Sequence, residues 1–225
     1  FPRRKVCGEC IAASNLPLLD ALGVGAAFAA AAGPELRHVE LMHRQNRVRA
    51  ELPAAADDQH RWGRALGRET LDPLLLERAR ECGAHILQPY RVRAIDGEIG
   101  AWNCHIQGRD HAPPQILSAP LLIDAHGSWE ALPVKQETAR AEHVDHGRSA
   151  KPRHRSDLFA FKANFRGGSL APGLLPVLAL DGGYGGIVVA DGGVTTLACC
   201  VRRDRLDALR AAMPGQPAGV VVESW

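Results

Sequence analysis

The sequence predicts a mixed α/β fold, with helices and strands interspersed along the chain. A helical repeat of apolar residues covers 71–82, and apolar patterns typical of strands occur both before and after it. The 225 residues include 23 glycines and 15 prolines, which favours many turns over a helical bundle. Because 46% of the residues are hydrophobic and 23% are charged, the chain can bury a core and has no composition typical of disorder.

Three segments have the apolar spacing of helices. The first is a loose stripe that ends at Gly23 and consists of Ile11, Leu16, Leu19 and Leu22. The clearest helix covers 71–82, where Thr70 is a plausible N-cap and Gly83 occupies the helix-terminating position. A last helix is predicted over 205–213, before a Pro-Gly pair. The apolar stretch 24–32, which is mostly alanine, is interpreted as a helix end.

The remaining patterned segments predict strands. Alternation on both sides of 44–46 predicts a hairpin over 36–52. Three further strands are predicted at 85–95, 101–107 and 116–125. The last of these contains Leu121-Leu122-Ile123, an uninterrupted apolar run of the kind found in buried strands. Four more strands, separated by Asp-Gly-Gly turns, predict an antiparallel sheet from 159–165, 175–180, 186–189 and 194–201.

A polar and basic stretch without periodicity separates the two halves of the chain. It covers 138–155 and contains several histidines, arginines and lysines. We therefore expect a first domain over 1–137, a connecting loop over 138–155 and a second domain over 156–225.

Charge and hydropathy exclude several classes of partner. The 27 basic and 25 acidic residues are scattered and give a net charge of +2, and no aromatic residue interleaves with the basic stretch 148–155, so no nucleic-acid partner is expected. The longest apolar stretch is far shorter than the roughly 20 residues that span a bilayer, which predicts no integral membrane segment. Peripheral membrane contact and the oligomeric state stay open. Because the opening residues lack a leader pattern, we expect a cytoplasmic protein.

Two glycine motifs imitate nucleotide-binding loops. Gly23-Val24-Gly25 has the start of a dinucleotide fingerprint, but Phe28 fills the third glycine position and a helix precedes the motif. The run 182–186 is glycine-rich but lacks the Lys-Ser/Thr pair of a phosphate loop. We interpret the first as a false match and the second as a hairpin turn.

The cysteines and histidines do not predict a metal site. Cys7-Gly8-Glu9-Cys10 has the spacing of a redox dithiol or of half a zinc site, but the chain has no second Cys-x-x-Cys. His143, Asp145 and His146 could bind a metal on a helix, yet a solvated basic loop is the commoner explanation. We expect no bound metal.

Four segments in this order resemble the geranylgeranyl-reductase-like branch of the FAD-dependent monooxygenase superfamily, which also includes aromatic hydroxylases and halogenases. The segments are 1–9, with Lys5-Val6-Cys7-Gly8-Glu9; 67–72, with Gly-Arg-Glu-Thr-Leu-Asp; 121–128; and 156–203. The resemblance implies part of a three-layer, Rossmann-like FAD-binding domain followed by a mostly antiparallel β-sheet substrate domain. The G-x-G-x-x-G loop of the family is not among the 225 residues, so the chain is similar to an interior piece of such an enzyme.

The same resemblance implies a set of flavin-binding residues, with the flavin beside the first segment. These residues are Arg4, Lys5, Val6, Cys7, Gly8, Arg68, Val92, Ala125 and Gly127. Cys7 is also a candidate catalytic residue, although a buried inert cysteine is an equal alternative.

The activity implied by the resemblance is that of an FAD-dependent oxidoreductase, with NAD(P)H as an optional electron donor. Its substrate would be a small organic molecule, either isoprenoid or aromatic, and the reaction would be alkene reduction or hydroxylation. Because the glycine loop that neutralises the pyrophosphate is not in the sequence, a non-catalytic binding domain with a degenerate flavoprotein fold is the alternative.

Overall fold

The computed structural model describes residues 2, 5–109, 113–126, 154–155 and 157–225. The chain divides into two compact units, one made of 1–84 with 151–225 and the other of 85–150. The first unit combines helices and strands, whereas the described part of the second contains strands only, so the chain as a whole is mixed α/β, as predicted. Most of the predicted connection 138–155 lies outside the described residues, so the boundaries of the predicted domains stay a prediction.

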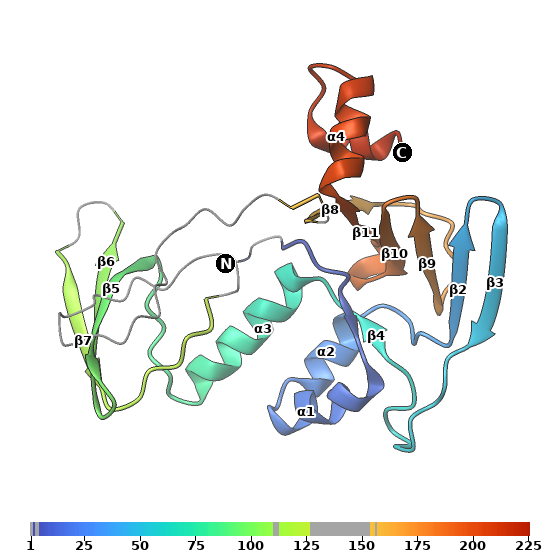
Figure 1. Ribbon diagram of the computed structural model, residues 1–225. Helices are drawn as coiled ribbons and strands as arrows, with labels where there is room; N and C mark the ends of the chain where they lie inside the picture. The colour runs from blue at the N-terminus through green and yellow to red at the C-terminus, as the bar shows by residue number, and fades with distance from the viewer. Residues whose placement is uncertain (1, 3–4, 110–112, 127–153, 156) are drawn as a thin grey trace. The chain divides into compact units, whose positions relative to one another are not determined.

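A six-stranded sheet organises the first unit, in the order β3-β2-β9-β10-β11-β8 (Figure 1). All neighbours are antiparallel except β2 and β9, which are parallel. The strands are β2 (His38–His43), β3 (Asn46–Glu51), β8 (Leu158–Phe165), β9 (Leu174–Leu180), β10 (Gly183–Val189) and β11 (Thr195–Arg202). The predicted hairpin is confirmed as β2–β3, and the four predicted C-terminal strands are confirmed as β8–β11. The hairpin joins the same sheet as those four strands, which lie more than 100 residues later.

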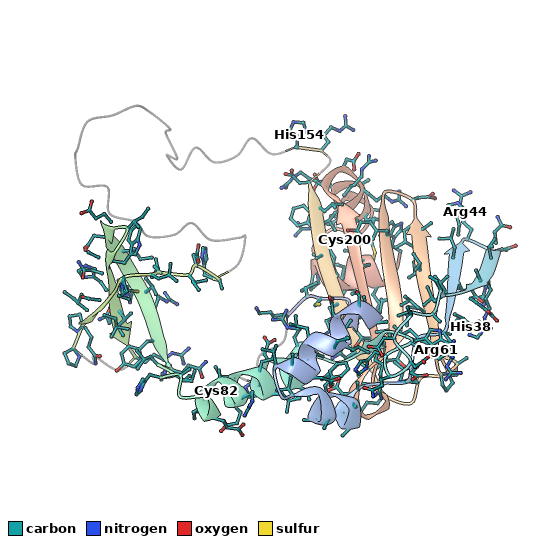
Figure 2. The ribbon with its side chains drawn as sticks, turned by 90° about the horizontal axis from the view of Figure 1, so that it is seen from below. His38, Arg44, Arg61, Cys82, His154 and Cys200 are labelled. Carbon is teal, nitrogen blue, oxygen red and sulfur yellow. The ribbon has the colours of Figure 1, made fainter. Side chains whose placement is uncertain are left out.

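The turns of this sheet follow the glycine positions of the sequence. Gly182 has a φ of 86°, in the left-handed region that glycine favours, and it joins β9 to β10. The next turn is the short helix η2 (Asp191–Gly193). At the tip of the β2–β3 hairpin Arg44 pairs with Asp181, and Figure 2 shows the arginine at that end of the sheet. Of the glycine-rich run, only Gly182 lies in the hairpin turn, whereas Gly183 to Gly186 belong to β10, so the interpretation as a turn is correct only for the start of the run.

Helices pack beside the sheet. The first group comprises η1 (Ala13–Asn15), α1 (Leu16–Ala21), α2 (Gly25–Ala31) and α3 (Arg68–Glu81). Their core consists of Leu16, Leu19, Val24, Phe28 and Leu66. The apolar stretch 24–32 is mostly a helix of its own. Gly23, with a φ of 78°, links α1 to α2. Because a helix rather than a strand precedes it, Gly23-Val24-Gly25 is a false match to a dinucleotide fingerprint.

The sheet has two differently covered faces. On one face α4 (Arg203–Ala212) and α5 (Ala218–Glu223) pack through Leu206 and Val222 onto Cys199 and Val201. The opposite face carries Val188, which packs with Leu36 and Ala65. Val188 is paired with Thr196, so both point to this second face. Ala65 belongs to β4 (Arg64–Ala65), which pairs with β1 (Cys10–Ile11).

The second unit contains a three-stranded antiparallel sheet made of β5 (Tyr90–Glu98), β6 (Ala101–Gly108) and β7 (Gln115–Ala119). The prediction of a buried strand at Leu121-Leu122-Ile123 is wrong. These residues follow the end of β7 without forming a strand, and Leu121 and Ile123 are 71% and 80% exposed. An apolar run becomes a buried strand only where neighbouring strands and a covering layer receive it, and the described residues of this unit supply neither. No helix of the described residues is long and apolar enough to cross a membrane.

Candidate functional site

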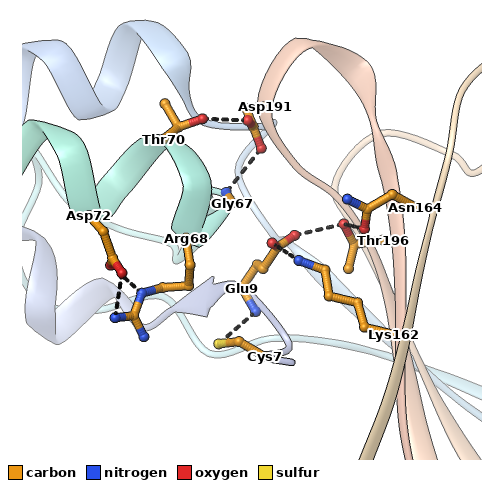
Figure 3. A network of polar contacts seen from close by, with 10 residues as sticks. All are labelled: Cys7, Glu9, Gly67, Arg68, Thr70, Asp72, Lys162, Asn164, Asp191 and Thr196. Carbon is orange, nitrogen blue, oxygen red and sulfur yellow. Dashed lines mark hydrogen bonds and ion pairs between the residues drawn. The ribbon is translucent and has the colours of Figure 1, made fainter. Parts of the chain in front are cut away.

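The predicted site residues of the first unit meet at the start of α3. Residues 5–8 form a loop that leads into β1, with Val6 and Gly8 exposed and Lys5 and Cys7 half-buried. Arg68 is the first residue of α3 and binds Asp72 through two nitrogens, at 2.5 and 3.1 Å. These hydrogen bonds raise the pKa of Arg68, and the nearby Cys7 thiol adds a smaller contribution. The loop and the arginine, which lie 60 residues apart, are therefore neighbours (Figure 3).

The remaining predicted residues belong to the second unit or lie outside the described residues. Arg4 and Gly127 lie outside the described residues. Val92 belongs to β5 of the second unit, beside a bulge, and is 42% exposed. Ala125 is also exposed in that unit, between Asp124 and His126, where the amide of His126 donates to Asp124 at 3.1 Å. Their predicted contacts with a cofactor stay predictions.

Glu9 is the most buried charged residue near the loop, and sequence reasoning missed it. Only 4% of the residue is exposed. Its carboxylate forms an ion pair with Lys162 of β8 and accepts a 2.6 Å hydrogen bond from the Thr196 hydroxyl of β11. Thr196 in turn lies 3.2 Å from the side-chain oxygen of Asn164. These three partners project from the same face of the sheet, because Asn164 pairs with Thr196 and Lys162 lies two residues away.

The backbone of Glu9 makes two further contacts. Its amide donates to the Cys7 sulfur at 3.4 Å, and its carbonyl accepts from the amide of Leu66 at 3.1 Å. Glu9 has a φ of 60°, an uncommon conformation for a residue with a side chain. One residue thus connects the loop, the entry to α3 and the sheet.

A second carboxylate caps α3. Asp191 of η2 accepts hydrogen bonds from the Gly67 amide at 3.0 Å and from the Thr70 hydroxyl at 2.7 Å. A Cβ on Gly67 would lie 2.8 Å from one Asp191 oxygen and 3.3 Å from a Glu9 oxygen. The positive end of the α3 dipole therefore faces two protein carboxylates, which stabilise the helix start. Thr70, predicted as an N-cap, lies inside the first turn and binds Asp191 instead.

One signal in the sequence could have found this cluster. Strand β8 alternates Phe159 and Phe161, which pack toward α4, with Lys162 and Asn164 on the opposite face. A half-buried lysine on a sheet face needs a polar partner, and Asn164 and Thr196, which are paired on neighbouring strands, lie on that same face. The partner in the loop could not be inferred from this pattern.

The thiols and the acidic groups do not form a metal site in the part of the chain that the structure describes. No group of three or more His, Cys, Asp or Glu side chains is placed to hold a metal ion there. All six cysteines are free. Although part of Cys10 is exposed, desolvation by the surrounding protein, with the charges of Cys7 and Glu9, raises the pKa of its thiol to about 11. His143, Asp145 and His146 lie outside the described residues.

The open part of the site is the loop itself. Among the described residues other than its two chain neighbours, no atom lies within 4 Å of the position that a Cβ on Gly8 would take. A flat group can therefore approach the backbone of the loop closely. Arg68, which is one-third exposed and held by Asp72, adds a fixed positive charge beside it. Together they can bind a planar group that carries a negative charge or a carbonyl oxygen.

Comparison with known proteins identifies the fold. No protein-family model matches the chain, and no curated protein sequence matches it. Among solved structures, the chain matches the myxobacterial chondrochloren halogenase CndH, an FAD-dependent halogenase, with a TM-score of 0.72 and 17% identity. That match covers 99% of this chain and 49% of CndH.

Two further matches have the same character. The flavin-dependent halogenase CmlS matches with a TM-score of 0.68 and 18% identity over 100% of this chain and 39% of CmlS. PqsL of Pseudomonas aeruginosa, named a probable FAD-dependent monooxygenase, matches with a TM-score of 0.61 and 16% identity over 93% of this chain and 54% of PqsL. The chain spans about half the length of these proteins, or less.

The chain therefore has the fold of a part of the FAD-dependent halogenases and monooxygenases. The resemblance to the flavin monooxygenase superfamily is confirmed at the level of the fold. The matches do not single out the geranylgeranyl-reductase-like branch.

Proposed function

We propose that this chain is part of an FAD-dependent oxidoreductase that acts on a small organic molecule. The observation that carries the proposal is the meeting of the open loop 5–8 with Arg68, within the fold of FAD-dependent halogenases and monooxygenases. Neither part would suffice alone, because the fold supports more than one activity and an exposed arginine is common.

The residues of the site fit a flavin. Gly8 leaves its backbone accessible to a planar ring, and Arg68 offers N–H groups to an anionic group or a carbonyl oxygen. Asp72 fixes the guanidinium by two hydrogen bonds, so little side-chain freedom is lost when a ligand binds. When bound, FAD would supply the redox chemistry, while the protein supplies binding and orientation.

Within this proposal, we favour hydroxylation of the substrate over alkene reduction as the reaction. The support is that the matched proteins are named as halogenases and a monooxygenase. NAD(P)H is the proposed electron donor. The alternative is that the protein belongs to the geranylgeranyl-reductase-like branch and acts on an isoprenoid rather than an aromatic substrate. This alternative rests on the sequence resemblance alone.

The test is flavin binding by the natural protein, with any sequence that its gene encodes on either side of these residues. We expect it to bind FAD, and Arg68→Ala to weaken binding by at least about 10-fold through loss of charge-assisted hydrogen bonds. Arg44→Ala is the matched control, because Arg44 also pairs with an aspartate but lies at the hairpin tip. A folded protein that binds no FAD would contradict the proposal and favour a non-catalytic binding domain.

A further inference from the structure

We propose that Glu9 is a positioning residue of the proposed flavin site, and that Lys162 acts through it. The proposal rests on the proposed function and deepens it, because it assigns the fixing of the loop 5–8 to a buried ion pair. Neither residue is predicted to touch the flavin. Their effect would pass through Cys7 and Gly8, which precede Glu9 in the chain.

The contacts of Glu9 give it control of the loop. Its carboxylate is held on the sheet by Lys162 and Thr196, which are 153 and 187 residues away in the sequence. Its amide is held against the Cys7 sulfur, and its carbonyl against Leu66, two residues before Arg68. Fixing one side chain on the sheet therefore fixes both the loop and its distance from the arginine (Figure 3).

The buried ion pair of Glu9 and Lys162 has a free-energy cost that a merely structural role would not require. The side chains of Glu9 and Lys162 are only 2% and 8% exposed, and the loss of hydration of two buried charges can exceed the energy of their mutual attraction. Glu9 also holds its backbone at a φ of 60°, a left-handed conformation that is unfavourable for residues other than glycine. An apolar pair of similar size would commonly give equal or greater stability. Costs of this kind concentrate at functional sites.

Neighbouring groups leave the carboxylate little freedom to move. Gly67 lies between the carboxylates of Glu9 and Asp191, and a Cβ there would be 3.3 Å from a Glu9 oxygen. Asp191 is itself fixed by Gly67 and Thr70. A change in the charge of Glu9 is therefore expected to shift the loop, whose outer side is open at Gly8.

The experiment compares Glu9→Gln with Glu35→Gln in the natural protein. Glu35 is a matched control because it also pairs with a cation, Arg37, but that pair is exposed. The readouts are FAD affinity, the absorbance spectrum of the bound flavin and amide hydrogen exchange of residues 5–8 without flavin. We expect Glu9→Gln to weaken FAD binding by at least about 10-fold, as changes of supporting residues do, and to alter the flavin spectrum. Exchange should accelerate in 5–8 but not in α4. Glu35→Gln should change affinity by about twofold or less.

A milder variant keeps the test decisive if Glu9→Gln does not fold. Thr196→Val removes only the hydroxyl that donates to Glu9 and retains the shape of the side chain. It should produce the same changes to a smaller extent. Unchanged affinity and spectrum in either folded variant would overturn the positioning role, as would exchange that rises equally in α4. If the wild-type protein binds no FAD, both proposals fail; if it binds FAD and the variants behave like it, only this one fails.

Discussion

The two units of the chain both contain a polar network, but the networks join very different parts of the sequence. In the first unit, the partners of Glu9 and Asp191 are 121 to 187 residues away. In the second unit, Asp96 binds Asn103 and His105, and Ser118 binds Asn103, over separations of 7 to 15 residues. The first network joins elements that are distant in the sequence, whereas the second joins neighbouring strands on one face of a small sheet.

Burial differs in the same way. Glu9 and Lys162 are almost completely buried, whereas the side chains of Asp96 and His105 are 22% and 26% exposed. Water can replace a lost partner in the second network but not in the first. The first network therefore joins the loop, α3 and the sheet, whereas the second contributes modestly to local stability.

The largest effect is expected from Lys162→Ala. The substitution leaves the buried carboxylate of Glu9 without its cation, which costs about 3–5 kcal/mol of unfolding free energy. Urea denaturation measures the change, with the exposed Arg44→Ala as the control. A loss as small as that of the control would show that the buried pair does not hold the first unit together.

Gly67→Ala is expected to come second. The new Cβ would lie 2.8 Å from an Asp191 oxygen, and overpacking of this kind costs about 1–3 kcal/mol. Gly8→Ala is the matched control for stability, because its Cβ would meet no atom of the described residues beyond its chain neighbours; the change should stay within about 0.5 kcal/mol. Gly8→Ala should nevertheless weaken FAD binding, since its methyl group projects from the open side of the loop. Equal stabilities of the two variants would contradict the close packing at Gly67.

A smaller effect is expected in the second unit. His105→Ala removes a hydrogen bond of 2.5 Å to Asp96, which retains its bond from Asn103. The loss should be about 0.5–1.5 kcal/mol, the net worth of an ordinary hydrogen bond. Amide hydrogen exchange should rise in β5 and β6 and remain unchanged at residues 5–8. A cost as large as that of Lys162→Ala would remove the contrast between the two networks.

The smallest effect concerns Cys10. Because burial and the neighbouring charges raise the pKa of its thiol to about 11, only about one thiol in a thousand is ionised at pH 8. Alkylation, which requires the thiolate, should accelerate about tenfold per pH unit up to about pH 11. Mass spectrometry would locate the label, with Cys10→Ser as the control.

The same shift has a consequence for stability. The unfolded thiol ionises at lower pH than the folded one, so the contribution of Cys10 to stability is lost as pH rises toward 11. Rapid labelling of Cys10 that is independent of pH would contradict the raised pKa.

Local elements could be predicted because their signals lie within a few residues. The stripe at Leu71, Leu74 and Leu75 became the partly buried side of α3 that packs on the helical core, and alternation around the 44–46 turn became the β2–β3 hairpin. The prediction of a buried strand at Leu121–Ile123 failed because these three apolar residues have the composition of such a strand but pair with no neighbouring strand among the described residues. Glu9 was missed because a glutamate in a Cys-x-x-Cys spacing gives no local sign of burial.

The amino-acid pattern alone was enough to predict α1, α3 and α4, most strands and the glycine turns, since helical period, strand alternation and turn chemistry are properties of neighbouring residues. It also predicted that the loop 5–8 and Arg68 belong to one site, through resemblance. The parallel pairing of β2 with β9, the ion pair of Glu9 with Lys162 and the capping of α3 by Asp191 became evident only in the folded chain. These contacts join residues more than 100 positions apart, and such partners are selected by the packing of the whole unit rather than by any local pattern.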